Sequence, residues 1–340
     1  IGFYLVKGMN NLVLNCDAHD NYDGYSEGDS GNVDGFGGHA NKETSTGNIF
    51  RGCRAWNNGD DGFDLINCYA SYIIEYCWSF RNGYKPHSIE SSGGNGAGFK
   101  SGGYGMGDIK KVPNPIPQHT VRYCLAYYNR QQGFYSNHHL GGLIFENNTA
   151  YKNPSNYNML NRKSSNEAVD VPGYGHIIKN NLSLSPRNSG GFPQHLINVD
   201  NTLSEIKNNS FAPNDLNLSE SDFESLNEQE LMGSRKSDGS LPDINFLRLT
   251  NHANFRFSGM GCFINEEAVD YSWIQEPAIV LENGVARIVG ENSKSFNKFY
   301  VNGEEVSIEN GIVDLTSMSG ELNLKAISEN GAVTTLIINK

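Results

Sequence analysis

Four aspartates and one lysine stand out in this chain as residues that could perform chemistry together. Asp60, Asp61 and Asp64 lie within the run Asn58-Gly-Asp-Asp-Gly-Phe-Asp64. Asp34 precedes another Gly-Phe pair, and Lys100 directly follows a third. Taken singly, such Asx- and Gly-rich runs are typical of exposed turns. Their recurrence beside Gly-Phe pairs indicates instead that they occupy equivalent positions of an internal repeat.

The repeat can be followed through the first two-thirds of the chain. A frame of the form Cys/Asn-x-Ala/Ser-x-x-Asn begins at Cys16, Cys53, Cys77, Cys124 and Asn148, with a weaker copy at Asn181. Gly-Phe pairs follow at Gly35-Phe36, Gly62-Phe63, Gly98-Phe99 and Gly133-Phe134. The intervals Cys53–Cys77 and Cys124–Asn148 are both 24 residues long. Short apolar strands at such a period, without helical periodicity, predict an all-β solenoid whose coils stack on one another.

Stacking converts equivalent positions into columns. The position before Gly-Phe holds Asp34, Asp61, Ala97 and Gln132, and the position after it holds Gly37, Asp64, Lys100 and Tyr135. Asp34 and Asp61 are therefore expected to lie about one coil, roughly 4.8 Å, apart. Carboxylates that close are unfavourable unless one is protonated or a cation lies between them. A hard divalent ion with oxygen ligands, most naturally Ca²⁺, resolves the conflict.

Lys100 is predicted to lie one coil from this cation site, in the column of Asp64. A neighbouring divalent cation disfavours the charged form of a lysine, so we expect a lowered pKa and a role for Lys100 as general base. The reaction that fits is β-elimination on a uronic acid. A cation that neutralises the sugar carboxylate acidifies the adjacent C5–H bond, and a base can then remove that proton.

Three further columns are predicted to build the interior. The first is a column of small buried thiols, since free cysteine behaves as a small hydrophobe. It consists of Cys16, Cys53, Cys77 and Cys124. The four phenylalanines form an aromatic column, and Asn21, Asn58, Asn82 and Asn129 form a ladder of amides in a turn. We therefore expect no disulfide framework among the six cysteines.

The remainder of the chain has a different pattern. The repeat fades near residues 209–213, a helix-like stretch follows at 219–231, and Asn-Gly pairs at residues 283, 302, 310 and 330 favour hairpins. We predict a solenoid at 1–232, an extended tail packing on it at 233–276, and a small antiparallel β-sandwich-like domain at 277–340. Residues 1–14 are too polar for a signal peptide and are interpreted as strand.

Charge and hydropathy exclude several function classes. A net charge of −12 disfavours nucleic acids and anionic membranes as partners. No apolar run long enough to span a membrane is present, so no membrane insertion is expected. We expect a monomer.

The motifs around Asp34, Asp60-Asp61-Gly-Phe-Asp64 and Gly98-Phe-Lys100 resemble those of polysaccharide lyase family 9, over roughly residues 1–213. The resemblance implies a right-handed parallel β-helix, a Ca²⁺ ion held by Asp34, Asp60, Asp61 and Asp64, and Lys100 as the base. It also implies an acidic pectic polysaccharide as substrate, either homogalacturonan or rhamnogalacturonan I, and a secreted, periplasmic or cell-surface protein.

An acidic protein that binds a polyanion needs local positive charge. Candidate substrate contacts in the coils after Lys100 are Arg130, His138, His139, Asn158, Arg162 and Lys163. Two alternatives stay open at this point. Asp60 and Asp61 superficially resemble the paired aspartates of a pectin glycoside hydrolase on the same fold. The acidic cluster could also be a structural Ca²⁺ site in a non-catalytic carbohydrate-binding solenoid.

Overall fold

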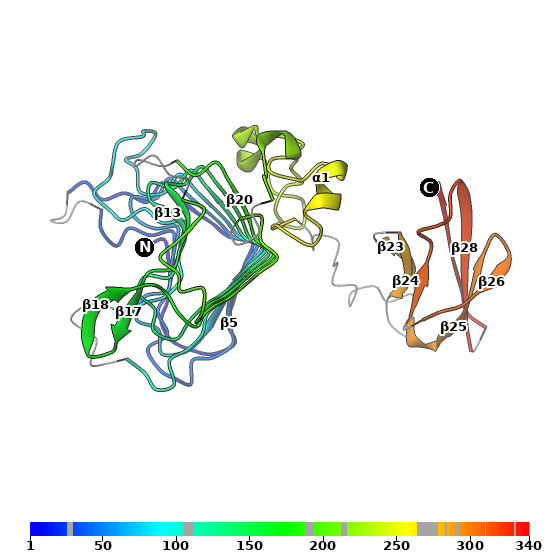
Figure 1. Cartoon of the computed structure of the whole chain (residues 1–340), viewed down its shortest axis with the longest axis horizontal. Coiled ribbons are helices and arrows are strands. Elements are labelled where there is room, and N and C mark those ends of the chain that lie inside the picture. The colour runs from blue at the N-terminus through cyan, green and yellow to red at the C-terminus, as the bar shows by residue number, and fades with distance from the viewer. Residues whose placement is uncertain are drawn as a thin grey trace. The chain divides into compact units, whose positions relative to one another are not determined.

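The first part of the chain is a parallel β-helix, which confirms the predicted solenoid (Figure 1). The computed structural model describes residues 1–25, 30–104, 112–187, 194–211, 216–263, 278–282, 284–289, 293–309, 311–329 and 331–339. Two seven-stranded sheets and one six-stranded sheet run along the solenoid, and strands within each sheet are parallel. No helix in these ranges is long and apolar enough to cross a membrane.

Each coil contributes short strands to three sheets. The sheet that carries the candidate site, here called sheet A, contains β1 (Phe3–Leu5), β4 (Phe36–Gly38), β7 (Phe63–Asp64), β10 (Phe99–Lys100), β13 (Gln132–Tyr135), β16 (Ser155–Asn158) and β21 (Leu196–Ile197). Sheet B contains β2 (Leu12–Leu14), β5 (Asn48–Arg51), β8 (Tyr72–Glu75), β11 (Thr120–Arg122), β14 (Ile144–Glu146), β19 (Ile177–Lys179) and β22 (Glu205–Lys207). Sheet C contains β3 (Asp17–His19), β6 (Arg54–Trp56), β9 (Trp78–Phe80), β12 (Leu125–Tyr127), β15 (Thr149–Tyr151) and β20 (Leu182–Leu184). A hairpin, β17 (Asn161–Ser164) and β18 (Glu167–Val171), projects beyond the coils.

The predicted aromatic column is confirmed. Ring centroids of Phe36, Phe63, Phe99 and Phe134 are stacked 4.9, 5.0 and 4.9 Å apart in successive coils. Tyr157 continues the stack at 4.9 Å, although no Gly-Phe pair marks its coil in the sequence. These rings are fully buried and fix the register of sheet A.

The asparagine ladder is also confirmed, and each amide uses both of its polar atoms. Asn58 Nδ2 donates to Asn82 Oδ1 at 2.9 Å, and Asn82 Nδ2 donates to Asn129 Oδ1 at 2.9 Å. Asn129 donates in turn to Asn153 at 3.1 Å. Because buried amides must be paired, the ladder ties each coil to the next at the turn that precedes sheet A.

Cysteines occupy a second interior column, and all six carry free thiols. Cys53, Cys77 and Cys124 are fully buried, whereas Cys16 is partly exposed. After Cys124 the position is taken by Asn148, whose Oδ1 accepts the backbone N–H of Cys124 at 3.0 Å. Burial raises the pKa of the Cys77 thiol well above its ordinary value, which keeps it protonated and unreactive.

The position of the repeat that holds Ala or Ser lies on sheet C, where the structure explains its small size. These small residues are in register from Ala18 to Ser183, and the alanines among them pack inside the solenoid. The flanking large residues, such as Trp56 and Tyr127, pack instead against residues 216–263. This segment, called the tail from here on, begins before the tail predicted at 233–276. Phe246 and Phe257 of the tail are fully buried there.

The stretch predicted to be helix-like forms two 3-10 turns, Glu220–Asp222 and Glu228–Met232. A helix that was not predicted, α1, spans Asn251–Arg256.

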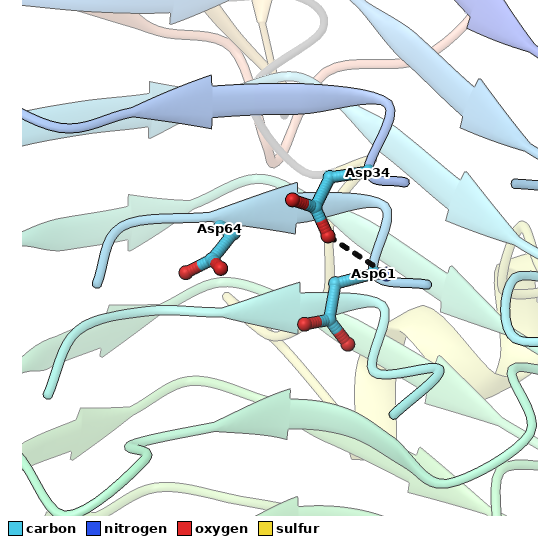
Figure 2. Close-up of side chains that lie close together, drawn as sticks. All are labelled: Asp34, Asp61 and Asp64. Carbon is cyan, nitrogen blue, oxygen red and sulfur yellow. Dashed lines mark hydrogen bonds between the residues drawn. The ribbon is translucent and has the colours of Figure 1, made fainter. Parts of the chain in front are cut away.

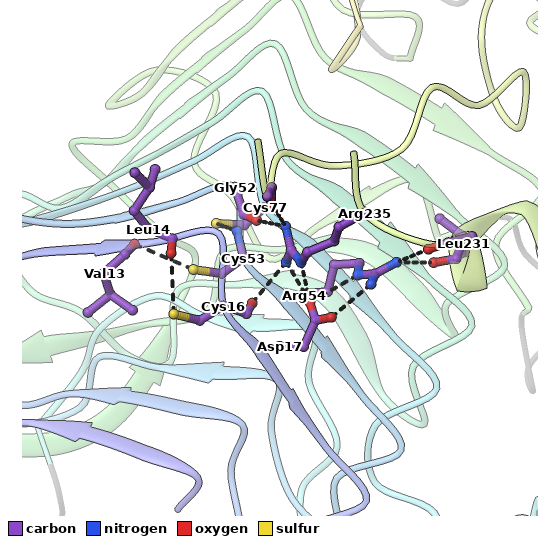
Figure 3. Close-up of polar contacts among 12 residues, drawn as sticks. Val13, Leu14, Cys16, Asp17, Gly52, Cys53, Arg54, Cys77, Leu231 and Arg235 are labelled. Carbon is purple, nitrogen blue, oxygen red and sulfur yellow. Dashed lines mark hydrogen bonds and ion pairs between the residues drawn. The ribbon is translucent and has the colours of Figure 1, made fainter. Parts of the chain in front are cut away.

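An ionic clamp joins the tail to the first coils (Figure 3). Arg54 Nη2 donates to Asp17 Oδ2 at 2.7 Å, and Arg54 Nη1 donates to the carbonyls of Leu231 and Gly233. Arg235 of the tail pairs with the same Asp17 carboxylate and donates to the carbonyl of Cys16 at 3.1 Å. Asp17 therefore bridges two guanidinium groups, one from sheet C and one from the tail.

We expect Asp17→Asn to destabilise the protein by about 1–3 kcal/mol, the range for losing charged hydrogen bonds that leave partly buried partners. Partial burial raises the pKa of Asp17, but hydrogen bonds from Arg54 and Arg235 outweigh it and lower the pKa below its ordinary value. The clamp thus stabilises the fold above about pH 4 and is lost as the pH falls through the lower folded pKa. Thermal melts at neutral and acidic pH measure this. A variant as stable as the wild type at neutral pH would contradict the clamp. Asp243→Asn, an exposed partner of Lys236, serves as the control.

The chain divides into two compact units, Ile1–Ile264 and Asn265–Lys340. The second unit has two antiparallel sheets, one of β23 (Ala278–Glu282), β24 (Val285–Val289) and β27 (Ile312–Asp314), the other of β25 (Phe296–Val301), β26 (Glu304–Val306), β28 (Glu321–Ser328) and β29 (Val333–Asn339). Its core includes Phe299, Leu315 and Leu324. The hairpin predicted at Asn302-Gly303 joins β25 to β26 and is confirmed. Asn283, Asn310, Asn330 and residues 264–277 lie outside the described residues, so the boundaries at 233 and 277 stay predictions.

Candidate active site

The predicted columns of sheet A bring the candidate residues together. Lys100 is in register with Asp64 on one side and with Tyr135 on the other. Asp61 and Asp34 lie just before the strands that follow them, β7 and β4. The glycine between each acidic residue and its phenylalanine is required by close packing: a Cβ on Gly62 would lie 2.7 Å from the carbonyl oxygen of Gly98 in the next coil.

Asp34, Asp61 and Asp64 form a buried triad in which one oxygen of each lies within 4.8 Å of the others (Figure 2). The triad side chains are between 0 and 4% exposed. Each uses one carboxylate oxygen to accept a backbone N–H, since Asp34 Oδ1 accepts from Asp61 at 3.1 Å, Asp61 Oδ1 from Ala97 at 2.6 Å and Asp64 Oδ1 from Ile66 at 2.8 Å. These amides orient the carboxylates and leave the second oxygens directed into a shared space.

The charges of the triad favour a bound cation. Burial and the neighbouring carboxylates raise the pKa of Asp34 well above its ordinary value. Burial also raises the pKa of Asp61 to about 7, although Lys100 opposes the shift. Oδ2 of Asp61 accepts no backbone N–H among the described residues and faces the Lys100 ammonium at 3.1 Å. Three crowded, buried carboxylates form an all-oxygen donor set, which fits Ca²⁺.

Asp60 lies beside the triad but does not belong to it. It is 4% exposed, and its two carboxylate oxygens accept backbone N–H groups, Oδ1 from Asn95 at 2.5 Å and Oδ2 from Asn32 at 2.6 Å. Its two oxygens bind the backbone of two neighbouring loops. Coordination by Asp60 stays a prediction.

Lys100 is the buried cation of the site. Its Nζ lies 3.1 Å from Asp61 Oδ2 and 3.1 Å from Asp64 Oδ2, and the residue is 8% exposed. Burial lowers the pKa of Lys100, but the carboxylates of Asp61, Asp64, Asp34 and Asp60 together outweigh it and raise the pKa. This sign is opposite to the one expected beside a divalent cation. A cation that neutralises the carboxylates would remove the cause of the raised Lys100 pKa. The lowered pKa predicted from the sequence therefore applies to the site with a cation bound.

Of the predicted substrate contacts, Arg130 and His138 border the site. The Arg130 guanidinium donates to the carbonyls of Gly94 and Asn95, in the loop whose backbone also binds Asp60. His138 Nε2 lies 3.0 Å from Asp170 Oδ1 on β18. Arg130 therefore holds the loop that binds Asp60, and His138 holds the hairpin, while contact of either with substrate stays a prediction.

The other four predicted substrate contacts differ in how far they are exposed. His139 is fully buried, its Nδ1 accepts the Gly103 N–H and its Nε2 faces the Pro117 carbonyl, so the structure gives it a role in the core and not the predicted substrate contact. Arg162 is buried against the Tyr104 carbonyl, and Lys163 pairs with Glu167 on the exposed side of the hairpin. Asn158 lies one coil beyond Tyr135 in the column of Lys100 and accepts from Asn198.

Comparisons with known proteins agree with this geometry. A family model described as "Pel9A-like, right handed beta helix region" matches residues 1–209, and one described as "Rhamnogalacturonan lyase-like, C-terminal" matches residues 200–335. The chain is 35% identical to pectate lyase L of Dickeya chrysanthemi over 78% of this chain and 54% of that protein. It is 29% identical to pectate lyase PEL9 of Emericella nidulans over 72% and 57% of the two chains.

Two solved structures are also similar. A rhamnogalacturonan lyase shares 55% identity, with a TM-score of 0.71 over 77% of this chain and 63% of that one. Pectate lyase Pel9A shares 34% identity, with a TM-score of 0.56 over 73% and 54%. The chain thus spans a little over half the length of the curated relatives given above.

Proposed function

Because the chain belongs to the Pel9A-like right-handed β-helix family, and the resemblance to polysaccharide lyase family 9 is thereby confirmed, we propose that it is a calcium-dependent lyase of the galacturonate-containing pectin backbone. The observation that carries the proposal is the position of Lys100, whose Nζ lies 3.1 Å from two members of a buried carboxylate triad. β-Elimination requires a proton acceptor beside a cation site and hydrolysis does not, and the position of Lys100 supports that role.

The chain's own residues divide the work. Asp34, Asp61 and Asp64 would hold the ion together with Asp60, which also binds the loops beside them. A bound Ca²⁺ would neutralise the carboxylate of the sugar and so make its C5 proton more acidic. Lys100, freed from its ion pairs, would accept that proton at Nζ. The sugar bond at C4 then breaks, leaving a double bond between C4 and C5.

Between the two pectin backbones, the comparisons favour rhamnogalacturonan. The solved structure with 55% identity is named a rhamnogalacturonan lyase, and the model that matches residues 200–335 is described as rhamnogalacturonan lyase-like. A pectic polysaccharide is encountered outside the cytoplasm, which supports a secreted or cell-surface location for the protein.

The test is incubation of the purified protein with rhamnogalacturonan and with polygalacturonate, with and without a chelator. We expect ultraviolet absorbance from the unsaturated product, faster on rhamnogalacturonan, and none in the chelator. New reducing ends without that absorbance would identify the hydrolase alternative. Retention of the polymer on the protein without any new ends would identify a binding module.

A further inference from the structure

Tyr135 follows Asp64 and Lys100 in one column of sheet A, on the side of Lys100 away from the acidic triad. On β13 it is the register partner of Lys100, just as Asp64 is on β7. Phe99 and Phe134, which precede the two residues, are fully buried, so alternation along each strand directs Lys100 and Tyr135 outward. The order along the solenoid is therefore Asp64, Lys100, Tyr135, one residue per coil and about 4.8 Å per step.

The ring of Tyr135 is held in place while its hydroxyl is left available. The ring meets the imidazole of His138 edge to face, with centroids 6.2 Å apart. His138 is in turn fixed by Asp170 of the β17–β18 hairpin at 3.0 Å. Within the described residues the Tyr135 hydroxyl makes no hydrogen bond, although the residue is half-buried. A tyrosine whose ring is fixed but whose hydroxyl makes no hydrogen bond is expected to bind a ligand through that hydroxyl.

The surrounding charges keep this hydroxyl protonated. Burial, together with Asp170 and Asp61, raises the pKa of Tyr135 to about 12, against the opposing effect of Lys100 and Arg162. A phenol in this state is a proton donor at neutral pH.

Two neighbouring polar side chains already have partners. The Arg130 guanidinium binds the carbonyls of Gly94 and Asn95, and His138 is paired with Asp170. Lys100 faces Asp61 and Asp64, on the opposite side of its strand from Tyr135.

We propose that Tyr135 is the proton donor to the departing glycosidic oxygen. The inference rests on the proposed lyase function and deepens it. The C5–H bond breaks and its proton passes to the neutral Lys100 Nζ, while the electron pair forms the second bond between C4 and C5. The C4–O bond breaks, its electron pair stays on oxygen, and that oxygen takes the proton of the Tyr135 hydroxyl. The Lys100 ammonium then returns a proton to the Tyr135 phenolate, directly or through water, which restores both groups.

The inference is tested with Tyr135→Phe, which removes one oxygen and keeps the ring against His138. Tyr76→Phe is the matched control, since Tyr76 is also a partly buried tyrosine with a pKa raised to about 12, but follows β8 in sheet B. Two substrates are compared: a rhamnogalacturonan oligosaccharide, and an analogue whose galacturonate carries fluoride at C4. Fluoride departs without needing a proton, so the analogue bypasses the donor but still needs the base.

On the oligosaccharide we expect Tyr135→Phe to lower kcat by roughly 10²–10⁴-fold with little change in KM, and Tyr76→Phe to match the wild type. On the fluoride analogue Tyr135→Phe should retain activity within about tenfold of the wild type, whereas Lys100→Ala should lose activity on both substrates. Equal losses of Tyr135→Phe on both substrates would mean that Tyr135 only positions the base, and unchanged turnover would mean that water or Lys100 supplies the proton. Either result overturns the inference. Failure of the lyase function itself is distinguishable, because the wild type would then give no unsaturated product from either substrate.

Discussion

Replacing Lys100 with alanine is expected to lower turnover by about 10²–10⁴-fold or more, the effect typical of losing a general base. The substitution removes the only lysine in the described part of the chain that lies within 4 Å of the triad carboxylates. Ca²⁺ affinity should change little or rise, because a positive charge that competes with the ion is removed. Product absorbance and calorimetric titration with Ca²⁺ measure the two effects separately.

The control for this experiment is Lys207→Ala, which deletes an exposed lysine paired with Glu205 on sheet B. Lys100→Arg retains the charge but should remain poorly active, since a guanidinium holds its proton far more tightly. Turnover of Lys100→Ala close to that of the wild type would assign proton abstraction to another residue and remove the basis of the proposed function.

Asp61→Asn should weaken Ca²⁺ binding and activity together, with partial recovery of activity at high Ca²⁺ concentration. Asp61 is fully buried, and its Oδ2 is one of the two triad oxygens that lie 3.1 Å from Lys100 Nζ. An amide at this position retains the size of the side chain but removes one of three negative charges that attract the ion. The measurement is activity as a function of free Ca²⁺, with Asp243→Asn as the control for loss of an exposed carboxylate.

The two substitutions are distinguishable by their calcium dependence. Lys100→Ala should stay inactive at any Ca²⁺ concentration, whereas the Asp61→Asn curve should shift to higher concentration. An Asp61→Asn protein with the wild-type calcium curve would show that the triad does not hold the catalytic ion.

The sequence predicted the columns of the solenoid well because each coil repeats a short motif. Once Gly-Phe pairs were aligned, Asp64, Lys100 and Tyr135 fell into the register that the strands adopt. Tyr157 was missed in the aromatic stack because its coil carries Ser155-Asn-Tyr157 in place of Gly-Phe.

Features that depend on loops could not be predicted in the same way. The backbone amides that occupy both oxygens of Asp60 come from residues 32 and 95, which lie in inserts of irregular length. His139 follows β13 by a few residues, and nothing in the repeat indicated that it turns into the core. The repeat predicts the column of Tyr135 but gives it no role, since only the positions of its neighbours show that its hydroxyl makes no hydrogen bond among the described residues.

The path of residues 216–263 has a consequence for how the β-helix unfolds. In a simple solenoid each coil contacts only its neighbours, so the ends can fray independently of the middle. Here the tail touches both ends: Cys262 N donates to Thr149 in a late coil, while Arg235 reaches Asp17 in the first strands. Opening the first coil therefore breaks contacts formed by a segment more than 200 residues later in the chain. The tail couples distant coils into one cooperative unit, so amide exchange from the first and late coils should occur in the same opening event.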